Sequence, residues 1–525
     1  MEGCRRKEPF KTIDTLQLLI MGVILSILFA LLMGGVVLVI LADGGDSGRK
    51  LAWLLIIAVL PVVGIILYLC LGINYRNHWY FYRKHRRYRD VFQEGTTTEL
   101  NHLLFSKSTL KGIEERFRPL ASLLSPHDFP APSEGNSLEI ITYGKRKFEL
   151  LMKDIAQAKE YIHFEYYLFG DDKWSNAVKD ALMAKAKEGV KVRFIHENIA
   201  NFSIKEKYYK EMVDAGIEVV KFTNPRKHFL NLATLLNFRN HRKIVIIDGK
   251  IGYTGGMNIK DRYFELWRDT HLRIEGPAAA SLQYVFLDSW LIAGGSIDRP
   301  FKDYFLPWTD TEAALPEKTS ETARPPQGPF SISTLESSLP VLSGKAVQIV
   351  PDEPDAQWPL IQMSYEWILH NTRKYVYIQS PYFIPPEPLF NAMKSAALSG
   401  ADVRIMLPKK VDTWFMGPAN RSYFMEALES GIRIFLRGGN FIHSKTLVCD
   451  DYLSIIGSAN LDPRSFSINY EVNSYVYDEE TALLSKEIFL KDLEISEEVT
   501  LEMWQKRPWY DNLGEKILRL FAPLL

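Results

Sequence analysis

The stretch FIHSKTLVCDDYLSIIGSAN, from Phe441 to Asn460, combines widely spaced polar residues with short apolar runs. It places His443, Lys445 and Asp450 in the order His-x-Lys-x-x-x-x-Asp, and Gly-Ser-x-Asn follows. A single copy of so short a pattern arises by chance and is weak evidence for a functional site. Its meaning therefore depends on whether the chain repeats it.

The chain does repeat it, as NHRKIVIIDGKIGYTGGMN from Asn240 to Asn258. Four polar residues of this copy have identical counterparts 202 residues later, which gives the pairs His241 and His443, Lys243 and Lys445, Asp248 and Asp450, and Asn258 and Asn460. The ungapped register continues to Asp269 and Glu471, so a carboxylate follows each histidine after 28 residues. Two matching copies favour a functional site over duplicated but inert surface residues.

The segments around the two copies are also repeated. YIHFEYYLF (161–169) and VKVRFI (190–195) read as strands, and NAVKDALMAKAKEG (176–189) between them reads as a helix that stops at glycine. KYVYIQSPYF (374–383) and LSGADVRIMLP (398–408) repeat this pattern later in the chain. The alternation predicts an α/β fold of two tandem α-β-α units, packed with pseudo-twofold symmetry.

Two uncharged stretches near the N-terminus are each long enough to cross a hydrocarbon core about 30 Å thick. They predict a transmembrane hairpin ahead of the α/β units. We therefore divide the chain into a tail and hairpin (1–75, with spans at about 16–42 and 51–73), a basic juxtamembrane connector (76–136), a first unit (137–305), a linker or surface loop (306–345), and a second unit with a C-terminal helix (346–525).

Charges beside the two spans predict their orientation. The run HWYFYRKHRRYRD (78–90) is basic and aromatic, the N-terminal tail is also basic, and the connection 43–50 has two acids and two bases. Both termini and the α/β units of a multi-pass membrane protein should therefore face the cytoplasm. The three cysteines are far apart, as is typical of a reducing compartment. The formal net charge of 0 gives no sign of a nucleic-acid partner.

The residue types in the repeated motif suit phosphate chemistry. Residues two apart on a strand share a face, so His241 lies beside Lys243 and His443 beside Lys445. Two symmetric units would bring both pairs, with two asparagines, into one cleft, where ammonium and amide groups bind phosphate oxygens. Lysine is a poor metal ligand and no ligand spacing accompanies it, so we expect neither metal nor cofactor.

Two histidines at one phosphodiester divide the work. One attacks phosphorus through a neutral nitrogen, and the other donates a proton to the leaving oxygen. The residues alone leave open which histidine attacks. Asp269 and Glu471 are expected to orient the imidazoles through their other ring nitrogen, and an ion pair with Arg268 or Arg262 is the alternative. Asp248 and Asp450 fall at the turn that ends the strand, where hydrogen bonding would shape the site.

The two motif copies resemble those of the phospholipase D superfamily. NHRKIVIIDGKIGYTGGMNIKDRY and WRDTHLRIEG are similar to the first catalytic block of bacterial cardiolipin synthases, and SPYFIPP and GSANLDPRSFSINYEVN are similar to their second half. WLLIIAVLPVVGIILYLCLG is similar to their membrane anchor. The resemblance covers nearly the whole chain.

This resemblance implies transfer of a phosphatidyl group from one phosphatidylglycerol to another, which gives cardiolipin and glycerol through a phosphohistidine. It implies His241 as nucleophile and His443 as general acid and base. By the same resemblance, further residues assist, with Lys243 and Lys445 catalytic, Asp248 and Asp450 supporting, and Asn258, Asn460 and Ser458 contacting phosphate. Gly256 departs from the family pattern, where serine is frequent, so the phosphate contacts are expected to be asymmetric.

Other functions remain open on the sequence alone. A phospholipase D-type hydrolase would use the same residues, and a phosphatidyltransferase could take phosphatidylethanolamine as donor. A membrane-anchored nuclease and a non-catalytic scaffold are less favoured. The expected partners are phosphatidylglycerol and other anionic lipids, and the sequence does not determine the oligomeric state. The C-terminal LGEKILRLFAPLL (513–525) is expected to pack on the core, with an interfacial helix as the alternative.

Overall fold

A computed structural model describes residues 15–42, 47–72, 98–106, 110–126, 129–222, 238–305, 339–354 and 356–519. The chain divides into two units, residues 1–77 and 78–525. The basic run at 78–90 and most of the predicted linker lie outside the described residues. The predicted boundaries at 137 and 346 fall inside strands β1 and β8, which begin at Ser133 and Leu342.

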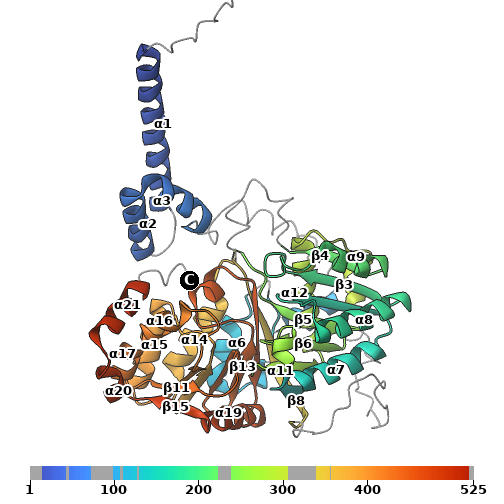
Figure 1. Ribbon diagram of the computed structural model, residues 1–525. Helices are drawn as coiled ribbons and strands as arrows, with labels where there is room; N and C mark the ends of the chain where they lie inside the picture. The colour runs from blue at the N-terminus through green and yellow to red at the C-terminus, as the bar shows by residue number, and fades with distance from the viewer. Residues whose placement is uncertain are drawn as a thin grey trace, which may run out of the picture. The chain divides into compact units, whose positions relative to one another are not determined.

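The first unit contains one long apolar helix, α1 (Thr15–Ala42) (Figure 1). Within it, Gln17–Ala42 has a mean hydropathy of 3.0 and is long and apolar enough to cross a membrane. It is the single helix among the described residues that meets both criteria. A helix of 26 residues extends about 39 Å, which exceeds the thickness of a hydrocarbon core.

The second predicted span, 51–73, does not form one continuous helix. It is divided among α2 (Ser47–Val59), α3 (Pro61–Leu67) and a π-helix (Tyr68–Gly72). The break falls at Leu60, with φ −130° and ψ 73°. Pro61 accounts for it, because a proline ring disfavours helical backbone at the preceding residue and supplies no N–H.

After this break the chain folds back on itself. The rings of Trp53 in α2 and Tyr68 meet edge to face, with centroids 5.6 Å apart. Gly64 in α3 allows the close approach, because a Cβ there would lie 2.8 Å from the Cα of Ile57. This structure therefore has a short helical hairpin where the sequence predicted a single second span.

The second unit is built on one 15-stranded sheet, ordered β15-β11-β10-β9-β12-β13-β14-β8-β1-β7-β6-β5-β2-β3-β4. From the central antiparallel pair β1 and β8, both halves read outward in equivalent order, and β15 is added at one edge. The strands of the first half are β1 (Ser133–Ile141), β2 (Tyr161–Tyr166), β3 (Lys191–His196), β4 (Glu218–Lys221), β5 (Lys243–Ile247), β6 (Ile251–Gly255) and β7 (His271–Glu275). Those of the second are β8 (Leu342–Asp352), β9 (Tyr375–Gln379), β10 (Asp402–Pro408), β11 (Arg433–Arg437), β12 (Thr446–Cys449), β13 (Leu453–Gly457), β14 (Glu471–Tyr477) and β15 (Ser496–Val499).

Helices cover both faces of each half (Figure 1). In and before the first half these are α5 (Thr98–Phe105), the 3₁₀-helix η3 (Glu115–Phe117), α6 (Arg118–Leu123), α7 (Gly144–Gln157), α8 (Lys173–Lys187), α9 (Glu206–Asp214), α11 (Asp261–Glu265), α12 (Ala278–Ile292) and η4 (Phe301–Tyr304). The second half has α14 (Leu360–Asn371), α15 (Glu387–Leu398), α16 (Met416–Arg421), α17 (Phe424–Glu429), α18 (Pro463–Ser467), α19 (Glu479–Leu493), α20 (Leu501–Gln505) and α21 (Trp509–Arg519). Each half has its own large apolar core.

The predicted mixed α/β organisation is confirmed. The strand expected at 161–169 is β2, the helix expected at 176–189 is α8, and the strand expected at 190–195 is β3. These elements could be recognised because each has a clear hydrophobic pattern and the helix stops at Gly189.

The C-terminal helix α21 differs from the expectation that its apolar face packs on the core. Trp509, Tyr510, Leu513 and Ile517 are all at least half exposed. Glu515 is instead buried, and it binds arginines that precede the helix in sequence. The helix is therefore attached through ion pairs and leaves these four side chains on the surface, and residues 520–525 of the expected helix lie outside the described residues.

Candidate active site

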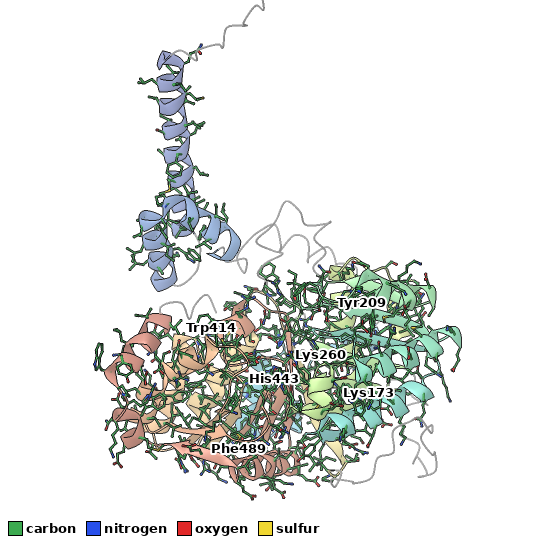
Figure 2. The ribbon with its side chains drawn as sticks, in the orientation of Figure 1. Lys173, Tyr209, Lys260, Trp414, His443 and Phe489 are labelled. Atoms are coloured by element: carbon green, nitrogen blue, oxygen red, sulfur yellow. The ribbon has the colours of Figure 1, made fainter. Side chains whose placement is uncertain are left out.

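The two histidines lie just before equivalent strands, β5 and β12, at the junction of the halves. The His241 N–H donates to the carbonyl of Tyr470 at 2.9 Å, and the His443 N–H donates to the carbonyl of Arg268 at 2.7 Å. Each histidine segment thus runs beside the segment of the other half that carries the carboxylate. Figure 2 labels His443 near the middle of the unit.

Each imidazole consequently binds a carboxylate from the opposite half. His241 Nδ1 lies 3.0 Å from both oxygens of Glu471, and His443 Nδ1 lies 2.7 Å from Asp269 Oδ2. Arg268 forms an ion pair with Asp492 at 2.9 Å and not with the carboxylate of Asp269. These distances suit the orienting role expected for the two carboxylates. The sequence did not predict that each histidine would take its carboxylate from the opposite half.

Both histidines line a cavity of about 590 Å³ between the halves. Asn258 and Asn460, the two asparagines of the motif copies, line it as well. The structure therefore brings four of the sequence-predicted residues to one space. That volume is within the range of small-molecule sites and exceeds what one phosphate group fills.

The lysines lie beneath the histidines. Lys243 Nζ donates to the carbonyl of His241 at 2.5 Å, and Lys445 Nζ donates to that of His443 at 2.5 Å. Burial lowers the pKa of Lys243 to about 7 and that of Lys445 to about 8, although nearby carboxylates oppose the change. A bound anion would therefore raise the pKa of each lysine and favour its charged form.

Burial also lowers the pKa of both imidazoles. It lowers the pKa of His241 to about 4, against the opposing effect of Glu471. It also lowers the pKa of His443 well below the usual value, and Lys445 and Lys243 add to this effect. Both rings are therefore neutral near pH 7, and each can donate its Nδ1–H to a carboxylate while Nε2 keeps a lone pair.

The two carboxylates are inequivalent. Burial raises the pKa of Asp269 to about 6, although Lys445 counteracts it. Burial acts in the same direction on Glu471, but His241, Lys243 and a hydrogen bond from Ser458 outweigh it, so the pKa of Glu471 is lowered. Glu471 is thus the more firmly ionised partner.

Ser458 and Gly256 explain part of this inequality. Ser458 does not line the cavity, because its hydroxyl donates to Glu471 Oε2 at 2.5 Å. The position of Ser458 therefore contradicts the expectation that it contacts phosphate. At the equivalent Gly256, an added Cβ would lie 2.1 Å from Asp269 Oδ1. The shorter aspartate occupies the space in which a serine side chain would stand.

The asparagines also differ in their contacts. Asn258 Nδ2 donates to the Tyr263 hydroxyl at 2.7 Å, and its Oδ1 accepts the N–H of Leu168 at 3.1 Å. Asn460 Nδ2 donates to Asp462 at 3.1 Å, and its buried Oδ1 has no hydrogen-bond partner. Asn460 therefore has a buried acceptor without a partner, whereas both ends of the Asn258 amide are bonded.

Asp248 and Asp450 do not reach the cavity. Both have φ 50°, at the turns that follow β5 and β12. Asp248 accepts the backbone N–H groups of residues 159–161, and Asp450 accepts those of residues 373–375, at 2.8 to 3.0 Å. They tie the start of β2 and β9 to the neighbouring strand, which is a structural role as the turn position suggested.

Several cavity residues lie outside the two motif copies. The Tyr167 ring lies 4.8 Å from that of His241, and the Trp267 and Tyr263 rings lie 5.2 Å and 5.4 Å from that of His443. Three arginines also line the cavity, namely Arg239, Arg262 and Arg464. Arg262 and Arg464 share the 202-residue offset, which was the available clue.

Among the described residues, no group of three or more histidine, cysteine, aspartate or glutamate side chains is arranged to hold a metal ion. The site instead offers two neutral imidazoles, two buried lysines and a set of arginines to an anion. Such a donor set can attack, protonate and electrostatically stabilise a phosphodiester.

Known proteins are similar to this chain in sequence. The family model described as cardiolipin synthase, PLD-like domain, matches residues 151–290 and 367–493, and one described as phospholipase D-nuclease N-terminal matches 30–72. The chain is 34% identical to the major cardiolipin synthase ClsA of Bacillus subtilis (strain 168), covering 96% of this chain and 100% of that protein. It is also 34% identical to a cardiolipin synthase of Alkalihalophilus pseudofirmus, covering 95% and 94%.

A solved structure has the same fold. The crystal structure of phosphatidylserine synthase from Haemophilus influenzae aligns with a TM-score of 0.51 at 16% identity, covering 73% of this chain and 92% of that one.

Proposed function

The chain belongs to the cardiolipin synthases of the phospholipase D superfamily, and on this basis we propose how its site joins two lipids. It acts as a phosphatidyltransferase that makes cardiolipin. The donor and acceptor are both phosphatidylglycerol, and the intermediate is a phosphohistidine. The observation that carries this mechanism is the pair of imidazoles on one cavity, each held by a carboxylate of the opposite half.

The reaction has two displacements. His241 Nε2 attacks the donor phosphorus, the bond from phosphorus to the headgroup oxygen breaks, and His443 donates a proton to the departing glycerol. The acceptor hydroxyl then gives its proton to His443 and attacks phosphorus, which breaks the phosphorus–nitrogen bond. Cardiolipin and glycerol are the products. Splitting one difficult displacement into two lowers each barrier.

The assignment of His241 as nucleophile rests on its partner. The firmly ionised Glu471 holds the Nδ1–H of His241 and leaves the Nε2 lone pair free to attack. His443 is neutral in the described state, so it must gain its proton when the substrate binds. A phosphodiester anion raises the pKa of a neighbouring imidazole and offsets the lysine charges.

Trapping the intermediate tests this assignment. The His443→Asn variant keeps the nucleophile and lacks the base that activates the acceptor, so a phosphatidyl-enzyme labelled on His241 should accumulate after acid quenching. The His241→Asn variant should carry no label. A label on residue 443 of the wild-type protein would reverse the two roles.

The product profile tests the function itself. Purified wild-type protein with phosphatidylglycerol as sole lipid should form cardiolipin and release glycerol, with chelator present throughout. Phosphatidic acid as the sole product would contradict the transferase and establish a hydrolase. A requirement for phosphatidylethanolamine would move the donor to that lipid, and loss of turnover with chelator would contradict the metal-free mechanism.

The substrates place the enzyme at a lipid surface. We propose that α1 spans the bacterial inner membrane and that the chain returns through residues 47–72, a multi-pass arrangement that leaves both termini and the catalytic unit in the cytoplasm, as the basic flanks favour. The matching strand order of the two halves supports pseudo-twofold packing. A cysteine introduced at Ser47, in a variant free of native cysteines, should react with an impermeant thiol reagent added outside intact spheroplasts. Labelling only after lysis would contradict the topology.

A further inference from the structure

The cavity has more than one cationic side chain to offer a phosphodiester. Three arginines line it, Arg239, Arg262 and Arg464, together with two aspartates, Asp412 and Asp462. The proposed reaction brings two anionic lipids together, and one phosphorus atom lies between the imidazoles. The second lipid has a phosphodiester of its own that does not react. An enzyme that uses this lipid rather than water as acceptor must bind that phosphodiester away from the two imidazoles.

Arg262 has the features of a substrate-binding cation. Its guanidinium carbon lies 4.2 Å from the centroid of the Trp267 ring and 5.5 Å from that of Tyr263. Its buried Nε has no hydrogen-bond partner, and no ion pair joins it to a carboxylate among the residues that the structure describes. A guanidinium held by stacking keeps its donors free and is well suited to bidentate binding of phosphate.

Arg262 lies on the His443 side of the cavity. The Trp267 ring on which it stacks is 5.2 Å from the His443 ring, and the charge of Arg262 contributes to lowering the pKa of His443. Tyr167, by contrast, is next to His241. Arg239 precedes His241 by two residues, and both Arg239 and Arg464 counteract the rise that burial causes in the pKa of Tyr167, so these two arginines lie on the His241 side.

The chemistry decides which lipid meets Arg262. In an in-line displacement the leaving and entering oxygens lie opposite the nucleophile, and here that is at His443. The entering oxygen belongs to a glycerol whose other end carries the acceptor's own phosphodiester. That phosphodiester lies one glycerol unit beyond His443, on the side where Arg262 is found.

We propose that Arg262, stacked on Trp267, binds the phosphodiester of the acceptor phosphatidylglycerol and so selects an anionic lipid over water or glycerol as acceptor. This inference rests on the proposed function. It makes Arg262 a determinant of acceptor use that the donor half-reaction does not need.

Two readouts on the full-length protein in phosphatidylglycerol vesicles test it. Exchange of labelled glycerol into phosphatidylglycerol reports formation and reversal of the phosphohistidine, and cardiolipin formation also requires the acceptor. Arg262→Gln should lower cardiolipin formation roughly 10-fold to 100-fold, as expected for loss of a charge-assisted hydrogen bond. Glycerol exchange should fall far less. Arg262→Lys should recover part of the cardiolipin rate because it restores the charge.

A matched control is Lys173→Gln. Lys173 is an exposed cation that also lies over a tryptophan ring, at 5.3 Å from Trp174, and it does not line the cavity. Figure 2 labels Lys173 apart from His443, on the first half. This variant should match the wild type in both readouts.

The outcomes separate the inference from the function. An equal loss of exchange and of cardiolipin in Arg262→Gln would overturn the acceptor role while the wild-type synthase activity stands. A selective loss in Arg464→Gln instead would place the acceptor on the His241 side and overturn the assignment. Wild-type protein that makes no cardiolipin would refute the proposed function before the variants are compared.

Discussion

At the scale of single residues, the two motif copies look alike in sequence and differ in their surroundings. His241 binds a glutamate that a serine hydroxyl supports, whereas His443 binds an aspartate beside a glycine. One carboxylate has a lowered pKa and the other a pKa raised to about 6. The different roles proposed for the two histidines rest on this difference.

The first prediction concerns pH. Lys243 and Lys445, with pKa values of about 7 and 8, lose their charge as pH rises through that range, whereas an ordinary lysine keeps it to about 10. Asp269 becomes protonated below about 6 and then no longer accepts from His443. We expect kcat/KM for the free enzyme to fall below about pH 6 and above about pH 8, measured in vesicles of constant composition. An alkaline limb near pH 10 would contradict the lowered lysine pKa values.

The second prediction concerns the glycine. Gly256→Ser places a side chain 2.1 Å from Asp269 Oδ1, so the carboxylate must move away from His443. We expect a loss of cardiolipin formation of about 10-fold to 100-fold, equivalent to about 1.4 to 3 kcal/mol, together with a lower Tm.

Gly514→Ser serves as its control, because a Cβ at that position meets open space. It should leave both turnover and Tm close to those of the wild type. A Gly256→Ser protein with wild-type turnover would show that Asp269 is not held where the structure places it, or that His443 does not depend on it.

At the scale of elements, two segments differ from what their hydrophobic residues predicted. The apolar residues 51–73 were expected to make one span, and Pro61 divides them. The apolar residues of α21 were expected to be covered, and an ion-paired glutamate is covered instead. Hydrophobicity indicates that a segment prefers an apolar environment and does not identify what provides it.

The third prediction belongs to α21. It contacts α16, whose first residue, Met416, lines the cavity, so its exposed apolar side chains are placed to meet the lipid surface that delivers the substrate. Replacing Leu513 and Ile517 together with aspartate should lower the rate on vesicles several-fold and leave Tm nearly unchanged.

The matched control is Leu483→Asp, which changes an exposed leucine on α19. It should keep the wild-type rate. Equal rates for the α21 double variant and the wild type would show that α21 does not touch the lipid surface during turnover.

At the scale of the whole molecule, the catalytic unit is an interlocked pair. Each imidazole takes its carboxylate from the other half, the central strands β1 and β8 pair, and buried Arg242 of the first half binds Glu353 of the second at 2.9 Å. Neither half alone contains a complete histidine–carboxylate pair. The active site is therefore a property of the assembled unit.

The fourth prediction follows from this interlocking. Proteins ending or beginning between residues 306 and 338 should be inactive when each is produced alone, because each histidine lacks its carboxylate. Co-expression should restore cardiolipin formation, because the halves associate through the sheet and the buried ion pair. Measurable activity in an isolated half would contradict the shared site.

Much of the protein was predictable from its sequence. Two motif copies with a constant offset indicated a two-histidine phosphodiester site, the hydrophobic periods indicated an α/β fold, and the uncharged N-terminal stretch indicated a helix long enough for a membrane. These features are local in the chain or repeat at a fixed interval. A linear pattern can therefore report them without any knowledge of packing.

Only the tertiary structure decided how the pieces meet. It showed that Glu471 contacts His241, that Asp269 contacts His443, and that the Ser458 hydroxyl donates to Glu471. It also placed Asp248 at a turn outside the cavity and Arg262 inside it. Contacts between residues more than 170 positions apart depend on how the two halves pack, and packing is set by the shapes and burial of many side chains together, which no spacing in the sequence records.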